Sequence, residues 1–405
     1  MKKVFELALG IVTSVGGFLE IGSITTAAQA GALFGYQLVW AIMLGGLCVI
    51  FLVEQAGRLA ASSRRTIPDA IRERFGFEYY AVLLVVMALV MLLVLGAELG
   101  GICIALEFVT GIGYRWWAVP VALVMWLIIW KGTFSFIEQG VSALGLVTVC
   151  FIVAAFILHP DWARVAAGAL PTLPTHERAR YWFIAVSILG ASITPYLMFF
   201  YSSGAIEDKW DESYLGVNRI IATVGMSFGS VISIAVLVVA ALVFLPRGIR
   251  MEHYQELARL LTDAFGVWGV RLVAASVGIA CLGAALEITL EMAYMIAQGF
   301  GWNWSKNQRP IAEARFSLTY TIVVILGALV VVTGIDPLKL TVFSMALTAA
   351  TLPLAIVPFL FLMNDEHYVG EHGNGWLSNT VVVVIIGLAF VLAVVTIPLE
   401  IFGGG

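Results

Sequence analysis

One carboxylate of this chain lies where a charge is costly. Glu20 stands within an apolar segment that spans residues 5–33, together with Ser23 and with glycines at positions 16, 17 and 22. Acidic residues at bilayer depth are rare and mostly functional, because removing a charge from water is expensive. Glycine is the poorest helix former after proline. We therefore expect the helix to break at Glu20, so that the carboxylate and unwound carbonyl groups face a polar cavity.

A second apolar segment, 181–203, is interrupted about 170 residues later, within residues 190–196. Pro195 removes a backbone donor and clashes with the carbonyl four residues before it, and Gly190 loosens the same turn. Two interrupted apolar segments at corresponding positions of two halves indicate a midplane binding site in a transporter built from repeats. For either break alone, a kink without function remains the alternative.

The two breaks together offer oxygen ligands of three kinds. Glu20 supplies a carboxylate, and the other candidates are the hydroxyl groups of Ser23, Ser192 and Thr194 and the carbonyl groups near Gly22, Gly190 and Ala191. Such a set suits Mg²⁺, Ca²⁺ or Mn²⁺. Mg²⁺ retains several waters and takes few protein ligands, so one carboxylate in a polar cavity suffices. The alternative for Ser192 and Thr194 is that they satisfy backbone groups freed by Pro195.

The composition places these breaks in a membrane protein. Of 405 residues 61% are hydrophobic and 12% are charged, and the mean hydropathy is +0.99. Apolar runs of about 20 residues recur along the chain, and each can cross a bilayer. The net charge of −4 gives no indication of nucleic-acid binding. All four cysteines lie in apolar runs, which predicts buried thiols without disulfides or a metal cluster.

The apolar runs predict eleven membrane-spanning helices in a single domain. They cover residues 5–33, 36–58, 79–107, 114–130, 138–158, 181–204, 214–245, 267–300, 315–334, 338–363 and 377–402. The first ten form two groups of five, about 5–158 and 181–364, each opening with a broken helix. Five helices in each group make the second repeat inverted relative to the first. An amphipathic stretch, 251–265, is predicted to lie at the membrane interface.

The basic residues predict the orientation of the chain. Five arginines follow the second predicted helix, in a loop over residues 58–74. Because cytoplasmic loops are enriched in lysine and arginine, we expect the N-terminus to be cytoplasmic. We expect a monomer that crosses the plasma membrane many times, and the initial apolar run is interpreted as the first span, not as a signal peptide.

Several short motifs resemble the Nramp divalent-metal transporters over nearly the whole chain. They are Phe34-Gly35-Tyr36, Gly57-Arg58-Leu59-Ala60, Ile71 to Gly76, Ala97-Glu98, Ile104-Ala105-Leu106 and Pro353 to Pro358. The resemblance implies an all-α, leucine-transporter-like fold. It also implies that the metal binds between broken helices 1 and 6 as a transported substrate, without a cofactor.

The signature positions of that family differ here. Its Asp-Pro-Gly-Asn motif falls on residues 20–23, which read Glu-Ile-Gly-Ser, and its Met-Pro-His motif falls on residues 194–196, which read Thr-Pro-Tyr. A further family histidine falls on Tyr201, a span-3 aspartate on Leu95, and a span-10 glutamine near Met345. This pattern is similar to the Nramp-related magnesium transporters. It implies Mg²⁺ or Mn²⁺ transport without proton coupling, with Glu20, Gly22, Ser23, Ala191, Thr194 and Tyr196 at the metal.

The histidines and four further glutamates leave alternative functions open. All five histidines lie in loops or at span ends, so the obvious proton relay is missing, although glutamates could carry protons. Glu98, Glu107, Glu287 and Glu291 could line an aqueous vestibule or serve structural roles. The rivals to an uncoupled magnesium transporter are a proton-coupled Mn²⁺ or Fe²⁺ carrier and a sodium-coupled amino-acid carrier. The sequence has no zinc-ligand motif, nucleophile elbow or phosphate loop at any span end, so it gives no indication of an enzyme.

Overall fold

The computed structural model describes residues 20–172, 174 and 176–403, and these residues fold into helices joined by turns. Eight helical stretches among the described residues are long and apolar enough to cross a membrane. They are Val39–Ser63, Ile67–Thr110, Arg178–Glu207, Glu212–Arg247, Tyr254–Gly299, Ala314–Val332, Pro337–Leu362 and Trp376–Val395. The chain is thus an all-α, multi-pass membrane protein, as the sequence predicts.

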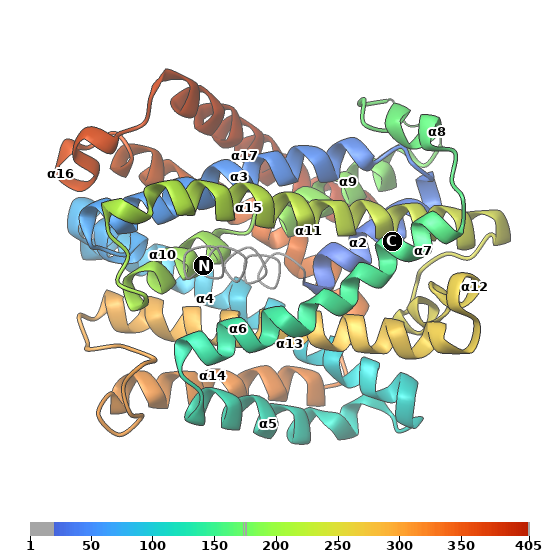
Figure 1. Ribbon diagram of the computed structural model, residues 1–405, viewed down its shortest axis with the longest axis horizontal. Helices are drawn as coiled ribbons and strands as arrows, with labels where there is room; N and C mark the ends of the chain where they lie inside the picture. Colours follow the sequence, from blue (N-terminus) through green and yellow to red (C-terminus); the bar gives the residue numbers. More distant parts are fainter. Residues whose placement is uncertain (1–19, 173, 175, 404–405) are drawn as a thin grey trace.

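The α-helices run roughly along one direction in a single bundle (Figure 1). Short helices α8 and α12 lie at one end of the bundle and α16 lies at the other. The helices are α2 (Ile21–Phe34), α3 (Val39–Ser63), α4 (Ile67–Thr110), α5 (Ala118–Lys131), α6 (Phe134–Gly145), α7 (Val149–Ile157), α8 (Trp162–Ala167), α9 (Arg178–Ser192), α10 (Pro195–Glu207), α11 (Leu215–Val243), α12 (Thr262–Phe265), α13 (Gly269–Gly299), α14 (Ala314–Val332), α15 (Pro337–Leu362), α16 (Glu366–Val369) and α17 (Trp376–Gly403).

Three predicted spans differ from the long helices. Spans 114–130 and 138–158 correspond to the shorter helix α5 and to the consecutive helices α6 and α7. The first span is described only from Glu20 onward, and Gly16 and Gly17 lie outside the described residues. The total of eleven spans and the division into two inverted repeats therefore stay predictions.

The predicted basic loop over residues 58–74 is helical at both ends, because α3 continues to Ser63 and only residues 64–66 lie between α3 and α4. Helix α4 already begins at Ile67, because Thr66 caps its first turn by accepting a hydrogen bond from the Asp69 amide. Pro68 also fits the first turn of a helix. Gly76 interrupts the helix with φ 85°, a conformation that glycine adopts without strain. The span predicted to start at residue 79 thus has a short helix before it.

The stretch 251–265, which is predicted to lie at the membrane interface, packs its apolar residues against the bundle. Its apolar residues Leu257, Leu260 and Leu261 are buried in the hydrophobic core. The stretch forms a 3₁₀ turn, Tyr254–Arg259, and the short helix α12, and the turn contacts both α4 and α13. Burying these leucines removes apolar surface from the water outside the bundle, which explains why the segment folds back onto it.

Helices α2 and α10 lie deep in the bundle, and long helices surround them. Helix α2 contacts α11, α9 and α15, and α10 contacts α3, α13 and α4. Nearly every residue of α2 and all residues of the best apolar window of α9 and α10 are buried. The beginnings of α2 and α10 therefore meet inside the protein, away from the lipid-facing surface.

Candidate metal-binding site

Glu20 is the last extended residue before helix α2. Its backbone has φ −118° and ψ 169°, and its carbonyl accepts the first helical bond, from the Ile24 amide. The side chain is 2% exposed, and its Oε2 atom accepts a hydrogen bond from the Tyr196 hydroxyl. Oε1 has no hydrogen-bond partner among the described residues. A buried carboxylate oxygen without a donor is a favourable ligand for a cation.

The second predicted break lies between α9 and α10. Ile193 and Thr194 have non-helical backbone conformations, and α10 begins at Pro195. Because proline has no amide hydrogen, the carbonyl of Ala191 lacks the donor that would continue the helix. The Thr194 hydroxyl adjoins that of Tyr196. The break thus places a hydroxyl, a phenol and a carbonyl within one turn of the chain.

Two carbonyl groups that are predicted to be unwound, those of Gly22 and Gly190, lie inside helices instead. Gly22 lies inside α2, and its carbonyl accepts a hydrogen bond of 2.7 Å from the Thr26 hydroxyl. Gly190 lies inside α9, so its carbonyl is not in an unwound segment. Ser192 Oγ donates to the Ile188 carbonyl at 2.8 Å. The hydroxyl therefore satisfies a backbone carbonyl, which is the structural role that the sequence offers as the alternative to metal binding. Ser23 is buried in the first turn of α2, beside Gly22.

Met345 of α15 lies between the two broken helices. A Cβ atom on Gly22 would lie 2.7 Å from the Met345 sulfur, and one on Gly190 would lie 2.3 Å from the Met345 carbonyl oxygen. Glycine is therefore required at both positions, because the backbone approaches Met345 so closely that a side chain at either position would overlap it. The thioether, a soft ligand, reaches the first turn of α2.

Glu98 of α4 is a second carboxylate at the start of α2. Both of its oxygens accept from the Ile21 amide, at 3.1 and 3.3 Å, and the side chain is fully buried. A carboxylate is favourable at a helix N-terminus, where amide groups lack helical partners. Glu98 is also close enough to Glu20 for electrostatic repulsion. Two acidic groups thus converge on one helix end.

Cys281 of α13 adjoins Glu98 and is fully buried. Neither break has a cysteine nearby in the sequence, yet the fold brings this thiol to the first turn of α2. All four cysteines are free, as predicted, and Cys150 is only partly buried. In the part of the chain that the structure describes, no three histidine, cysteine or acidic residues form a group suited to a metal ion. The candidate site consequently depends on mixed oxygen ligands.

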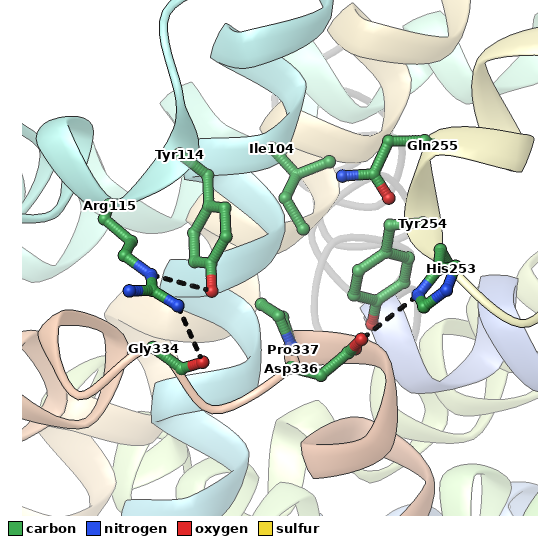
Figure 2. Close-up of a pocket in the computed structure, with 9 residues that line it drawn as sticks. All are labelled: Ile104, Tyr114, Arg115, His253, Tyr254, Gln255, Gly334, Asp336 and Pro337. Atoms are coloured by element: carbon green, nitrogen blue, oxygen red, sulfur yellow. Dashed lines mark hydrogen bonds and ion pairs between the residues drawn. The ribbon is translucent and has the colours of Figure 1, made fainter.

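A polar cavity of about 200 Å³ lies at the end of the bundle opposite α16. Figure 2 shows Arg115 and Tyr114 on one side of it and His253 and Tyr254 on the other. The Tyr254 hydroxyl reaches from this cavity to Thr341, at 2.6 Å, and accepts from Thr25 of α2 at 3.5 Å. The hydrogen-bonded hydroxyl groups of Tyr254, Thr341 and Thr25 therefore lie between the cavity and α2, the helix whose first turn adjoins the candidate site.

The family model described as "Nramp: Natural resistance-associated macrophage protein-like" matches residues 10–398. The chain belongs to the Nramp family. Similar proteins include the divalent metal cation transporter MntH of Caldanaerobacter subterraneus subsp. tengcongensis, 24% identical over 97% of this chain and 92% of the relative. MntH of Deinococcus radiodurans is 26% identical over 94% of this chain and 88% of the relative.

Solved structures show the fold. The manganese transporter of Eremococcus coleocola, in complex with an aromatic bis-isothiourea compound, superposes with a TM-score of 0.81 at 20% identity, covering 98% of this chain and 87% of the other. Mhp1, a nucleobase-cation-symport-1 family transporter, superposes with a TM-score of 0.66 at 14% identity, covering 97% and 92% of the two chains. This Nramp-family chain therefore has the predicted leucine-transporter-like fold.

The structure of this Nramp-family protein brings Glu20, Thr194 and Tyr196 together, with Gly22 and Ser23 in the adjacent helical turn. From the sequence alone, the role of Glu98 stays open between an aqueous vestibule and a structural one, and Met345 is placed near the site only by resemblance. The available signal for Glu98 was its position in the Ala97-Glu98 motif, at bilayer depth. Cys281 carried no local signal, because its neighbours in the sequence are all apolar or small.

Proposed function

We propose that this protein moves divalent cations across the membrane by alternating access, with Mg²⁺ as the main substrate and Mn²⁺ as a second one. The observation that carries the proposal is the buried Glu20 carboxylate, which has one oxygen without a partner among the described residues, at the meeting point of two broken helices. The relatives named as divalent metal cation transporters support the general class of substrate. The protein is a transporter and not an enzyme.

The preference for Mg²⁺ is proposed from the ligand types. Thr194 and Tyr196 stand where the resemblance places a methionine and a histidine, so the two residues that flank Pro195 offer oxygen ligands instead of sulfur and nitrogen. Oxygen ligands do not favour soft ions over Mg²⁺. Mg²⁺ gives up water reluctantly, and a site with one carboxylate and neutral oxygens can hold it largely hydrated. We propose Glu20, Ser23, Ala191, Thr194 and Tyr196 as the contacts, with Gly22 allowing close packing.

Transport without proton coupling is proposed from the positions of the histidines. His159, His176, His253, His367 and His372 all lie outside the eight long membrane-crossing stretches. Histidine is the side chain whose ordinary pKa is suited to proton exchange near neutral pH. We further propose a monomer in the plasma membrane with a cytoplasmic N-terminus, which places the α16 end of the bundle in the cytoplasm.

A proton-coupled Mn²⁺ transporter is the second candidate, and two observations favour it. The Met345 thioether packs against Gly22, where it could reward a softer ion. Glu98, buried beside Glu20, is a carboxylate that could carry a proton. The two candidates differ in what accompanies the metal and in which metal is preferred, so one experiment separates them.

The purified protein is reconstituted in liposomes that contain a metal-sensitive dye and, in a parallel set, a pH-sensitive dye. We expect Mg²⁺ and Mn²⁺ to enter, with no change in luminal pH, and Glu20→Gln liposomes serve as the inactive control. Metal-dependent acidification of the lumen together with uptake of Mn²⁺ but not Mg²⁺ would establish the second candidate. No uptake of any divalent ion by the parent protein would overturn both.

A further inference from the structure

Glu291 is a buried carboxylate that the proposed metal site does not use. It lies on α13, is fully buried, and neither of its oxygens accepts a hydrogen bond by distance and angle from a described residue. Removing an isolated charge from water is very unfavourable unless a cation or a proton neutralises it. The side chain therefore needs a partner that is not a protein cation.

Glu207, in the same region, is a carboxylate whose oxygens are fully hydrogen-bonded. At the end of α10 it accepts four hydrogen bonds, from the Tyr294 hydroxyl, the Ser305 hydroxyl, the Lys306 amide and the Asn307 side chain, at 2.5–3.0 Å. Glu291 precedes Tyr294 by one helical turn and has none of these donors. The difference is local and cannot be attributed to a general lack of polar groups between α10 and α13.

Other oxygen ligands surround Glu291. Ser203 of α10 adjoins its carboxylate. The Gln298 amide nitrogen donates to the Ser203 hydroxyl at 3.2 Å, which leaves the Gln298 Oε1 oxygen, also buried, without a partner among the residues described. Residues 291 and 298 are seven apart on α13 and so lie on one face of the helix. A carboxylate, a hydroxyl and an amide oxygen are the ligand types that Mg²⁺ and Mn²⁺ accept.

The nearby arginine is already committed elsewhere. Arg72 donates to the backbone carbonyls of Gln298 and Gly299, at 2.5 and 3.3 Å, and pairs with Asp69 at 3.7 Å. It therefore caps the end of α13, where helix carbonyls lack partners, instead of neutralising Glu291. Glu291 is therefore neutralised by a proton or by a bound cation, and a divalent ion that binds there displaces the proton.

Helix α10 connects this group to the Glu20 centre. Tyr196, which bonds Glu20, and Ser203, which adjoins Glu291, are seven residues apart and so lie on the same face, about 10 Å apart along the axis. Beyond Ser203 the helix continues to Glu207, toward the end of the bundle that carries α16 (Figure 1). Polar groups thus lie at both ends of this face of α10, with the buried rings of Phe199 and Phe200 between them.

We propose that Glu291, Ser203 and Gln298 form a second binding site for a divalent cation, between the Glu20 centre and the α16 end of the bundle. The inference rests on the proposed function, because the ion bound here is the transported ion on its way between the centre and one side of the membrane. Glu291 supplies the charge, and the hydroxyl and the amide oxygen replace part of the hydration shell.

The test counts bound ions. Purified full-length protein in detergent at pH 7 is titrated with Mn²⁺, and free Mn²⁺ is measured by electron paramagnetic resonance. We expect two Mn²⁺ ions per chain for the parent, one for Glu291→Gln and one for Glu20→Gln. Thr289→Val is the matched control, because Thr289 is equally buried on the same helix and also lacks a hydrogen-bond partner among the described residues. It should bind as many ions as the parent.

Two further variants keep the inference testable if Glu291→Gln does not fold. Ser203→Ala and Gln298→Leu each remove one neutral ligand and should weaken the second Mn²⁺ by about 10-fold while leaving the first unchanged. Parent-like binding of two ions by Glu291→Gln, or a parent that binds a single ion, overturns the second site. Failure of the transport function is a separate result, since it is measured as absence of flux by the parent in liposomes, whatever the number of ions bound.

Discussion

The Tyr196 hydroxyl donates a hydrogen bond to Oε2 of Glu20, and this contact joins two residues 176 positions apart in the chain. It ties the first turn of α10 to the residue that precedes α2. It occupies only one carboxylate oxygen, and no residue in the described part of the chain bonds Oε1, which leaves that oxygen available to an ion. The bond therefore holds the carboxylate in place without satisfying it, which is the arrangement that a reversible metal site needs.

We predict that Glu20→Gln abolishes divalent-ion transport while the protein still folds. The amide keeps the shape of the side chain but removes the charge that attracts the ion. Uptake of Mg²⁺ and Mn²⁺ into liposomes is the measurement, and gel filtration confirms folding. Transport by the variant at the parent rate would place the site elsewhere.

Tyr196→Phe is expected to weaken Mg²⁺ binding by roughly 10-fold, because the carboxylate loses the donor that orients it. The variant should fold, since the ring that fills the core is retained. Tyr201→Phe is the control, because it removes a hydroxyl on the same helix that donates to Asn218 at 3.0 Å. Calorimetry on the three proteins is the measurement, and equal affinities for all three would remove Tyr196 from the site.

Thr194→Met is expected to raise the affinity for Cd²⁺ relative to Mg²⁺, because a thioether favours softer ions. The parent should bind Cd²⁺ weakly, although the Met345 sulfur lies near Gly22. Calorimetry with Cd²⁺, Mg²⁺ and Mn²⁺ decides the question. If the parent binds Cd²⁺ tightly and Met345→Leu abolishes that binding, Met345 is a ligand and the preference for Mg²⁺ is wrong.

Gly190→Ala is expected to lower stability by about 1–3 kcal/mol and to impair transport. Its Cβ atom would lie 2.3 Å from the Met345 carbonyl oxygen, so α9 and α15 would have to move apart. Gly216→Ala, in α11 and with no atom within 4 Å of the added carbon, is the matched control and should be neutral or stabilising. Thermal unfolding in detergent compares the two, and equal melting temperatures would show that the contact can relax.

Glu207→Ala is expected to destabilise the protein by about 3 kcal/mol, because it leaves buried donors from α13 and the 305–307 turn without their acceptor. Glu291→Gln, measured without metal, should cost far less, since among the described residues only the Ser203 hydroxyl adjoins that carboxylate and no set of buried donors depends on it. Melting temperatures in metal-free buffer test the contrast. A larger loss for Glu291→Gln than for Glu207→Ala would contradict the assignment of both residues.

The two helix breaks and the membrane class could be predicted from the sequence because their causes are local. Pro195 removes a hydrogen-bond donor wherever it stands, and a long apolar run needs a bilayer or a buried core around it. The same reasoning identified Glu20, since a carboxylate at that depth has few explanations. It placed unwound carbonyls at Gly22 and Gly190, two or three residues away from the observed breaks, because helix ends are decided by caps and packing as well as by propensity.

Only the tertiary structure decided which distant groups share the centre. Glu98, Cys281 and Met345 come from three other helices, and their side chains meet the first turn of α2 because of how those helices pack, which no local pattern in the sequence records. The same holds for two glutamates on neighbouring elements, Glu207 and Glu291. Sequence alone shows Glu207 at the start of a charged stretch and Glu291 within an apolar run, whereas the folded chain brings four donors to Glu207 and, among the described residues, only the Ser203 hydroxyl close to Glu291. Whether a buried carboxylate is structural or free to bind an ion depends on its neighbours in space, and packing alone determines those neighbours.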